Sequence, residues 1–551
     1  MLEILITTIL LLVVFSGFGK IVSQLNLNIW DGFSGRLFSG ILLLTTILTA
    51  TAFFTPLTST IEFITLLLGF SSFVVLKGYN DFIAFFKQND KYWITPLIFI
   101  LFTTSFSPYI LDHFGYYVPT ISWLSTFGIT KGLVNMDLIL AQTSFWHILQ
   151  TGFSHIIDTS LRLNSIVTCI YVIYIFENRQ WNLLIFLPFF YFFLQSPSPD
   201  LPVLALSILI LNEILKGSKT SYGLFAASVF LFCIKPTLIW LPLISFIAIL
   251  KTKYFGILKI IPAVVVLFLF ILKNYFTFGF PIVPVQIGDL NLAWKPNTEI
   301  LKDSAKTAIE KTYDLQYTFE EISKFSTTDY IVNWFTLKGL KSIINCGLIL
   351  SILAFSIYAW LQKNTTVRWL WFAIVIKSIL VLIFSAQYRF FLDVFLVIGF
   401  LFLQNIPRKT SVFIFYSFSF GICILLTFPQ IIRSTVPSFF LGTIMKPFEW
   451  NQILKPGIYE HNKYTTHTVG NMTFNLTQEG PYIFDTPAPS ITPYHAKQAL
   501  DLGYFPQWIN KHQKKEGIIY QKINLNEQKK LNDILTKYIR RYKSKQPASS
   551  D

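Results

Sequence analysis

The sequence predicts an all-α polytopic membrane protein that crosses the bilayer about 14 times, with extracytoplasmic loops and a small C-terminal α+β segment. Composition is the first reason: 53% of the 551 residues are hydrophobic and only 13% are charged, against roughly 25% charged in an ordinary soluble domain. The second reason is that runs such as 41–53 and 411–426 are apolar on every side, which a half-exposed soluble helix does not tolerate. The third is the distribution of positive charge between the runs.

The predicted spans fall into three groups. Hydropathy places them near residues 1–17, 38–54, 59–76, 92–110, 163–177, 181–194, 201–215, 221–234, 237–250, 254–272, 345–362, 367–385, 390–404 and 411–428. The first run has the length of a signal peptide, but it opens with Glu3 and lacks a small-x-small cleavage site, so we expect a retained helix. The resulting regions are 1–110, 163–272 and 345–428 in the membrane, the loops 111–162 and 273–344, and the tail 429–551.

Positive charge predicts the orientation of the chain. The basic residues of alternate short connections fall on one side of the membrane: Lys20, Arg36, Lys77, Lys87, Lys91, Arg179, Lys216, Lys219, Lys251, Lys253, Lys363, Arg368, Arg408 and Lys409. This side is expected to be cytoplasmic, which predicts a protein of the inner (cytoplasmic) membrane whose long loops and tail are extracytoplasmic. The net charge of +15 then reflects orientation, and no nucleic-acid partner is predicted. The exceptions on the outer side are Lys235 and Arg389.

The outer segments carry local signals of secondary structure. Two capping boxes predict short helices in the second loop, alternating residues around a Gly-Asn turn predict a hairpin in the tail, and a basic helix is expected to end the chain. These signals are Thr318 with Glu321, Ser326 with Asp329, residues 464–469 and 472–476 around Gly470-Asn471, and about residues 527–542.

The residues best placed for chemistry begin where the fourth predicted span leaves the membrane. Asp112 lies there among aromatic residues, at the depth of the lipid phosphates. Partial desolvation makes a carboxylate a better proton acceptor, so Asp112 is a candidate general base that would also orient a substrate hydroxyl. The alternative is that Asp112 only caps the interfacial helix that follows. Candidates for substrate contact in the same loop are Tyr116, Tyr117, Trp123 and Asn135.

This loop resembles the first outer loop of a bacterial branch of the GT-C superfamily, the multispanning glycosyltransferases that use polyprenyl-phosphate-linked sugars. The elements that carry the resemblance are Asp112, Tyr116-Tyr117, Trp123, residues 128–135 and residues 143–146. Later landmarks follow in order: Asp200 between prolines, Lys235-Pro236-Thr237, Lys273-Asn274-Tyr275, Trp294-Lys295-Pro296, Gln387-Tyr388-Arg389-Phe390 and Asp485. The likeness covers about residues 105–495. Tyr117 stands where the branch's pattern has a histidine, so the role of that imidazole does not carry over.

The resemblance implies an inverting transfer of a hexose or pentose from a polyprenyl phosphate, with Asp112 accepting the proton of the acceptor. A cation must then offset the charge that grows on the departing phosphate. Arg389, whose planar fork suits a phosphate, is the first candidate, followed by Lys273 and Lys235. The alternative for each is that it snorkels to lipid head groups. Asp200 and Gln387 are weaker candidates for substrate contact; Asp200 is equally explained as part of a turn, and a divalent cation is left open as a cofactor.

The acceptor of the glycosyltransferase has no recognisable sequence signature, and a glycan, a lipid or a protein of the cell envelope all fit.

Two other functions share much of this pattern. A flippase or other transporter of lipid-linked oligosaccharides would also have many spans and a basic inner face, but transporters usually place polar groups near the middle of the membrane on broken helices. An oligosaccharide polymerase or ligase would share the outer site and use a diphosphate-linked donor. The lipid donor that is consumed separates these functions.

Overall fold

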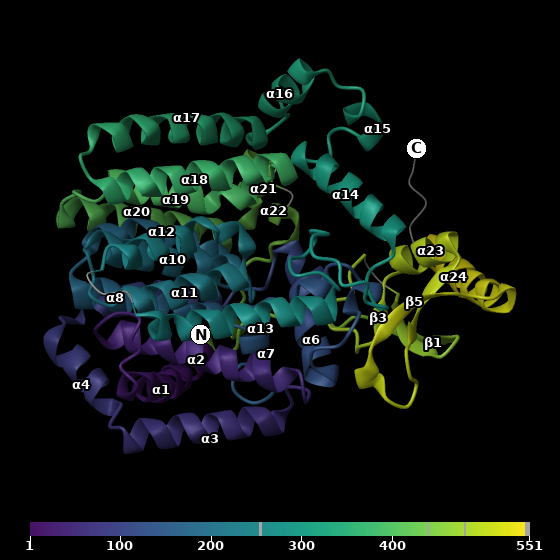
Figure 1. Ribbon diagram of the computed structural model, residues 1–551, viewed down its shortest axis with the longest axis horizontal. Coiled ribbons are helices and arrows are strands. Elements are labelled where there is room, and N and C mark those ends of the chain that lie inside the picture. Colours follow the sequence, from purple (N-terminus) through teal and green to yellow (C-terminus); the bar gives the residue numbers. More distant parts are fainter. Residues whose placement is uncertain (253–255, 438, 440, 479–480, 546–551) are drawn as a thin grey trace.

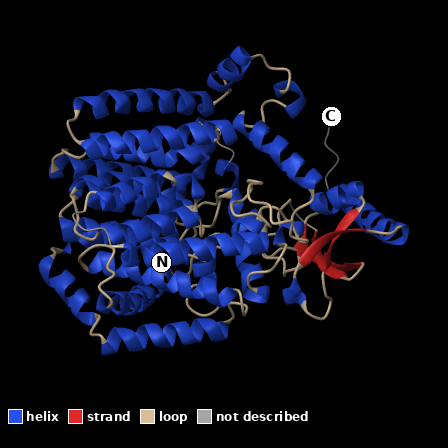
Figure 2. Ribbon diagram, in the orientation of Figure 1, coloured by secondary structure: helices blue, strands red, loops and turns tan. Residues whose placement is uncertain are grey.

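The computed structural model is a helical bundle with a small strand-containing unit at one end (Figure 1, Figure 2). It describes the whole chain except residues 253–255, 438, 440, 479–480 and 546–551, so Lys253 of the predicted basic face lies outside the described residues. In Figure 1 the long helices run roughly parallel, and both sheets gather near the right-hand end of the bundle. We call this end, with the loops around residues 111–162 and 278–339, the loop end.

The bundle is made of long helices and a few shorter ones. They are α1 (Leu2–Gln24), α2 (Phe33–Ala52), α3 (Ser59–Val75), α4 (Tyr79–Gln88), α5 (Ile94–Thr104), α8 (Leu163–Asn178), α9 (Leu187–Phe190), α10 (Asp200–Leu215), α11 (Ser221–Ile234), α12 (Trp240–Leu250), α13 (Ile261–Thr277), α17 (Leu340–Leu361), α18 (Thr365–Phe384), α19 (Leu392–Phe402) and α20 (Arg408–Thr427). Other helices lie at the loop end: η2 (His113–Tyr117), α6 (Val118–Phe127), α7 (Phe145–Thr151), α14 (Thr298–Thr312), α15 (Phe319–Ile322), α16 (Thr327–Phe335), η9 (Tyr388–Phe391), α21 (Pro429–Thr435), α22 (Leu441–Ile444), α23 (Pro493–Leu502) and α24 (Leu525–Lys545).

Six described helices are long and apolar enough to cross a membrane, and the pair α3 and α4, bent by 65°, brings the number to as many as seven. This is the pattern of a multi-pass membrane protein. Every one of the 14 predicted spans coincides with a helix or a helical stretch. Seven of them correspond to the six long helices and the bent pair, and the helices at the remaining seven are shorter than a full span. Several predicted limits are wrong. α1 continues to Gln24 instead of ending at 17, α2 begins at Phe33 instead of 38, and α5 ends at Thr104 instead of 110. α13 continues to Thr277 instead of ending at 272, and α17 begins at Leu340 instead of 345.

The first two helices pack closely because small residues lie where they cross. A Cβ atom on Gly19 would lie 2.1 Å from the carbonyl oxygen of Arg36, and one on Gly40 would lie 2.0 Å from that of Phe15. Glycine is therefore required at both positions, as is common where membrane helices approach each other closely.

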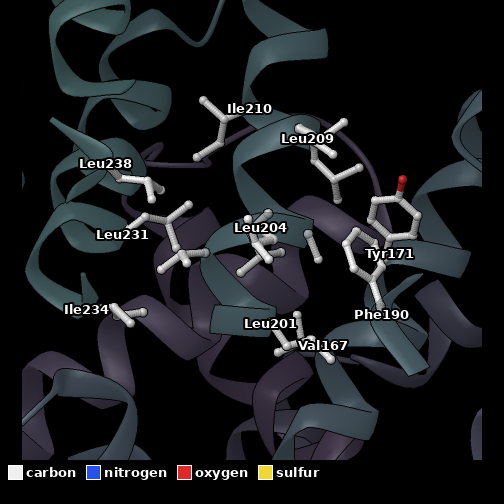
Figure 3. Packing of buried hydrophobic residues seen from close by; sticks show 14 of the residues in the cluster. Val167, Tyr171, Phe190, Leu201, Leu204, Leu209, Ile210, Leu231, Ile234 and Leu238 are labelled. Atoms are coloured by element: carbon white, nitrogen blue, oxygen red, sulfur yellow. The ribbon is translucent and has the colours of Figure 1, made fainter. Parts of the chain in front are cut away.

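The centre of the bundle is formed by α8, α10 and α11, whose residues are nearly all buried. Figure 3 shows Leu204, Leu209 and Leu231 of this core together with the rings of Tyr171 and Phe190. Helices α8 and α10 have 16 residues each, fewer than the roughly 20 that cross the hydrocarbon layer. Because protein surrounds these helices on all sides, their apolar composition reflects burial among other helices as much as contact with lipid.

The described strands, β1 to β5, all lie in the C-terminal unit. β1 (Tyr464–Val469) pairs antiparallel with β2 (Met472–Thr477), which confirms the predicted hairpin; β3 (Ser490–Ile491) adds parallel to β2, and β4 (Tyr504–Trp508) pairs antiparallel with β5 (Ile518–Lys522). α24 confirms the predicted terminal helix, and the capping boxes that open α15 and α16 are both formed. A separate apolar core joins this unit to the first loop through Trp123 and Leu133.

Candidate functional site

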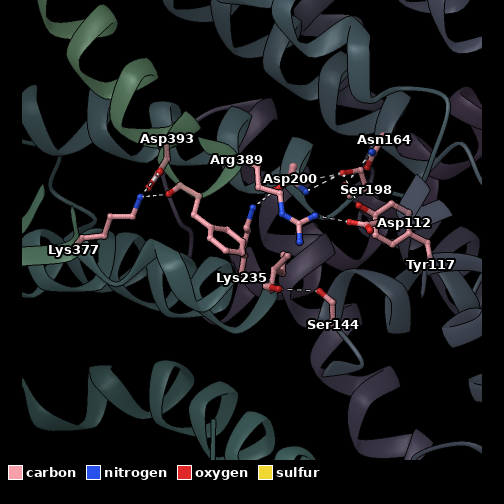
Figure 4. Close-up of polar contacts among 12 residues, drawn as sticks. Asp112, Tyr117, Ser144, Asn164, Ser198, Asp200, Lys235, Lys377, Arg389 and Asp393 are labelled. Carbon is pink, nitrogen blue, oxygen red and sulfur yellow. Dashed lines mark hydrogen bonds and ion pairs between the residues drawn. The ribbon is translucent and has the colours of Figure 1, made fainter. Parts of the chain in front are cut away.

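The site is built where the first long loop, residues 111–162, meets the turn between α18 and α19. Asp112 directly precedes η2, a π-helical turn, and Arg389 lies on η9. Nη1 of Arg389 donates to Oδ2 of Asp112 at 2.8 Å, although the two residues are 277 positions apart (Figure 4). Both side chains remain about 40% exposed. The candidate base and the preferred phosphate ligand therefore meet at the loop end of the bundle.

A pocket of about 280 Å³ opens beside this ion pair. It is lined by Leu111, Asp112, Lys311, Thr312, Asp314, Leu315, Leu337, Lys341, Asn345, Ala386, Gln387, Tyr388 and Arg389. Three cations and two carboxylates thus converge on one concave surface, where water is partly excluded and electrostatic interactions are stronger than in bulk solvent. The mixture suits an anionic ligand that also carries hydroxyl groups.

Lys311, at the end of α14, is the cation in this pocket that sequence reasoning missed. It forms no hydrogen bond or ion pair with any residue that the structure describes. Burial lowers the pKa of its ammonium group below the ordinary range for lysine, and the neighbouring Arg389 lowers the pKa further, while Asp112 acts in the opposite direction. The other lysine of the pocket, Lys341, is paired with Asp314 at 3.1 Å. Lys311 is therefore the cation most available to a bound anion.

A second ion pair lies next to the first. Lys235 contacts the carboxylate of Asp200, and Oγ of Ser198 lies 3.5 Å from the same carboxylate. The hydroxyl of Tyr117 donates to Ser198 at 3.4 Å (Figure 4). Burial raises the pKa of Tyr117, and Asp112 and Asp200 raise it further, so the phenol stays protonated. The predicted residues Tyr117, Asp200 and Lys235 therefore flank the pocket and are paired with one another rather than free.

A buried ion pair between Lys377 and Asp393 holds the turn that carries Arg389. Nζ of Lys377 contacts Oδ1 of Asp393 at 2.7 Å and also donates to the carbonyl of Phe390. Oδ2 of Asp393 accepts from Nε1 of Trp240 at 2.8 Å. The side chains of Lys377 and Asp393 are 0% and 5% exposed. Figure 4 shows this pair on the side of Arg389 away from Asp112. It fixes the backbone next to Arg389.

Other predicted site residues have structural partners instead. Trp123 packs in the core of the C-terminal unit, because Trp508 of β4 lies against its ring. Its indole nitrogen donates to Oγ1 of Thr130 at 3.0 Å. Asn135 donates to the carbonyls of two distant segments. Lys273 is buried and donates to the carbonyl of Gln142 at 2.7 Å, since α13 passes behind that loop. None of these three lines the pocket. Tyr116 is also buried, against the ring of His147.

Gln387 does line the pocket, and its amide nitrogen donates to Oγ of Ser385 at 2.8 Å. The side chain is thereby held at the pocket wall. Among the residues that the structure describes, no group of three or more His, Cys, Asp and Glu side chains is arranged to hold a metal ion.

Comparison with known proteins finds one family. A family model described as a domain of unknown function (DUF8201) matches residues 1–396, which include every residue that lines the pocket. No curated protein and no solved structure matches the chain.

Proposed function

The chain belongs to the DUF8201 family, and we propose that it is a GT-C-like membrane glycosyltransferase that transfers a sugar from a polyprenyl phosphate to a cell-envelope acceptor. The observation that carries this proposal is the meeting of Asp112 and Arg389 in one pocket. The sequence predicts different roles for the two residues, a general base for Asp112 and a phosphate ligand for Arg389, and they are far apart in the chain. A site for transfer needs both within reach of one substrate.

In this proposal the loop end faces the outside of the cytoplasmic membrane, and about 14 segments cross or enter the bilayer. The basic residues of the alternate connections then lie in the cytoplasm. The pocket lies next to the outer ends of α17, α18 and α19, which is the depth at which the phosphate of a membrane-bound donor would lie.

The chemistry follows from the charges of the pocket. Phosphate oxygens bind Arg389 and Lys311, and they compete with Asp112 for the guanidinium group. The released carboxylate accepts the proton of the acceptor hydroxyl as its oxygen bonds to the anomeric carbon. The bond from that carbon to the phosphate oxygen breaks with inversion, and its electron pair leaves with the polyprenyl phosphate. Arg389 and Lys311 stabilise the charge that grows on this leaving group.

The first test is transfer by the purified chain in proteoliposomes from a panel of labelled lipid-linked sugars. The panel contains polyprenyl-monophosphate and polyprenyl-diphosphate donors. Consumption of a monophosphate donor supports the proposal. Consumption of diphosphate donors alone would instead indicate the polymerase or ligase, and movement of an intact donor across the bilayer without transfer would indicate a transporter.

Replacing Arg389 by glutamine is expected to raise the KM for the donor at least tenfold, because a charge-assisted phosphate contact contributes about 1.5–3 kcal/mol. The matched control is Lys338→Gln, which removes an exposed cation close to the pocket that does not line it. The measurement is the initial rate against donor concentration for both variants. An unchanged KM in Arg389→Gln would remove Arg389 from the donor site.

Lys311 predicts a pH dependence of donor binding. Its pKa is lowered, so the ammonium group loses its proton at a lower pH than an ordinary lysine. Donor affinity should therefore fall as the pH rises through the alkaline range, and the fall should begin below pH ~10.4, the ordinary lysine value. Lys311→Arg should abolish this fall, because a guanidinium stays charged there. The measurement is donor Kd against pH; a fall that persists in the arginine variant would exclude Lys311 as its source.

One observation favours transport as a second candidate. Helices α3 and α4 are bent by 65° at a short break, the arrangement of a broken span or a re-entrant loop, and Asp81 of α4 lies within 3.0 Å of both Lys20 and Arg36. Broken helices with buried charges are typical of transporters. The two cations, however, lie near the ends of α1 and α2 that are remote from the loop end, and both are paired with the carboxylate of Asp81. We therefore favour an anchoring role for this cluster.

A further inference from the structure

Helix α16 carries an apolar surface that the protein covers only in part. Trp334 is buried, whereas Tyr330, Ile331 and Val332 are exposed, Ile331 by 58%. The capping box of Ser326 fixes the first turn, so the helix and its apolar side chains are preformed. Adjacent exposed apolar side chains of this size indicate a surface that another phase or molecule covers.

This surface is continuous with the outward face of α17. Residues 336–339 join the two helices. Ile343 and Leu350 of α17 are 67% and 66% exposed, and α17 is one of the helices able to cross a membrane. An exposed apolar row on such a helix faces lipid tails. In Figure 1, α17 lies at the edge of the bundle and α16 lies beside its loop end. The same lipid that covers α17 is therefore in reach of α16.

Exposed lysines lie on both sides of α16, while the acidic Asp329 of its first turn is engaged in the capping box of Ser326. Lys324 precedes the helix and Lys338 follows it, and both are exposed. Lysines beside an apolar helix face place their ammonium groups at the level of the lipid phosphates. Tyr330 adds a ring with a polar tip, the kind of side chain that concentrates at this level.

We propose that α16 is an interfacial helix that lies in the leaflet at the loop end, with Tyr330, Ile331 and Val332 inserted between head groups and upper acyl chains. The helix is tied to the pocket. The carbonyl of Trp334 accepts from Nδ2 of the pocket residue Asn345 at 2.8 Å, and the carbonyl of Tyr330 accepts from the hydroxyl of Tyr313 at 3.1 Å. The depth of α16 in the leaflet thus sets the height of the pocket wall relative to the lipid phosphates. This proposal does not depend on glycosyl transfer.

The test is the depth of a spin label in the full chain, reconstituted in nanodiscs of phosphatidylcholine. Cys346 is exposed and Cys423 partly exposed, so both are first replaced by alanine. A label is then placed by Ile331→Cys, with Leu350→Cys as the lipid reference and Glu320→Cys, exposed on α15, as the aqueous reference. Accessibility to oxygen and to a water-soluble nickel chelate is measured for each. Val332→Cys provides a second position if Ile331→Cys does not fold.

At position 331 the label should collide with oxygen more often than at position 320, though less often than at the deeper position 350, and with the nickel chelate several-fold less often than at position 320. Nickel accessibility equal to that at 320 would overturn the proposal, because α16 would lie in water. Low accessibility to both reagents would also overturn it, because the helix would then be covered by protein instead of lipid.

Discussion

Replacing Asp112 by asparagine is expected to lower the rate constant of glycosyl transfer roughly 10²- to 10⁴-fold, the range for loss of a general base. The amide keeps the shape of the side chain and can still accept a hydrogen bond from Arg389, but it cannot take the proton of the acceptor. Donor affinity should change little or improve, because Arg389 no longer has a carboxylate to compete with the phosphate. The measurement is single-turnover transfer in proteoliposomes at saturating donor, at equal amounts of folded protein.

The pocket offers a matched control for this substitution. Asp314 lines the same pocket and pairs with Lys341, so Asp314→Asn removes one negative charge without touching the candidate base. It should leave the rate constant within a few-fold of the wild type. Equal losses in the two variants would mean that the charge of the pocket matters and that Asp112 has no special role. A fully active Asp112→Asn protein would refute the assignment of the base.

Lys377→Met is expected to give the largest loss of stability. It leaves the carboxylate of Asp393 without a cation where the pair is 0% and 5% exposed, and breaking a buried pair in this way costs about 3–5 kcal/mol. The second substitution Asp393→Asn should restore most of this loss, because it removes the unpaired charge and keeps an acceptor for Trp240. The measurement is the unfolding free energy, or the Tm, of both variants in the same detergent.

The exposed pair of Lys302 and Glu299 provides the reference for this comparison. Lys302→Met should leave the Tm unchanged, because exposed ion pairs contribute little. If Lys377→Met were as stable as Lys302→Met, the buried pair would have no structural role. If Asp393→Asn failed to rescue the single variant, the contact of Lys377 with the carbonyl of Phe390 would be the dominant one.

Local rules predicted the parts of this chain that depend on neighbouring residues. The capping box of Ser326 and the hairpin at Gly470 both form, because each requires only residues a few positions apart. Hydropathy located the helices but did not separate α8, which is buried among other helices, from α17, which is largely exposed. Burial in protein and burial in lipid select the same apolar side chains, so composition alone does not distinguish them.

The distribution of charge along the sequence predicted some of the pocket residues and did not predict others. Arg389 was identified because a cation in an outer connection is an exception to the positive-inside pattern. Lys311 lies in a polar helix among several other charged residues, and nothing in its local sequence marks it. Its role arises from the packing of α14 against the turn after α18, where Oγ1 of Thr312 accepts from the backbone of Ala386 at 3.1 Å. Trp123 has the aromatic character of a substrate contact but packs in a core, because β4 covers it.

The contacts of residues 484 and 518 with the first loop also determine when that loop gains its partners during synthesis. The amide of Asn135 bonds to the carbonyl of Ile518, 383 residues later, and the backbone of Phe484 donates to the carbonyl of Phe114, two residues from Asp112. At a synthesis rate of about 5–20 residues per second, the loop waits roughly 20–80 s for these partners. During that interval the loop that carries Asp112 lacks these hydrogen-bond partners in the nascent chain. Phe484 and Ile518, synthesised long after the first loop, are therefore among the residues that close the structure around it.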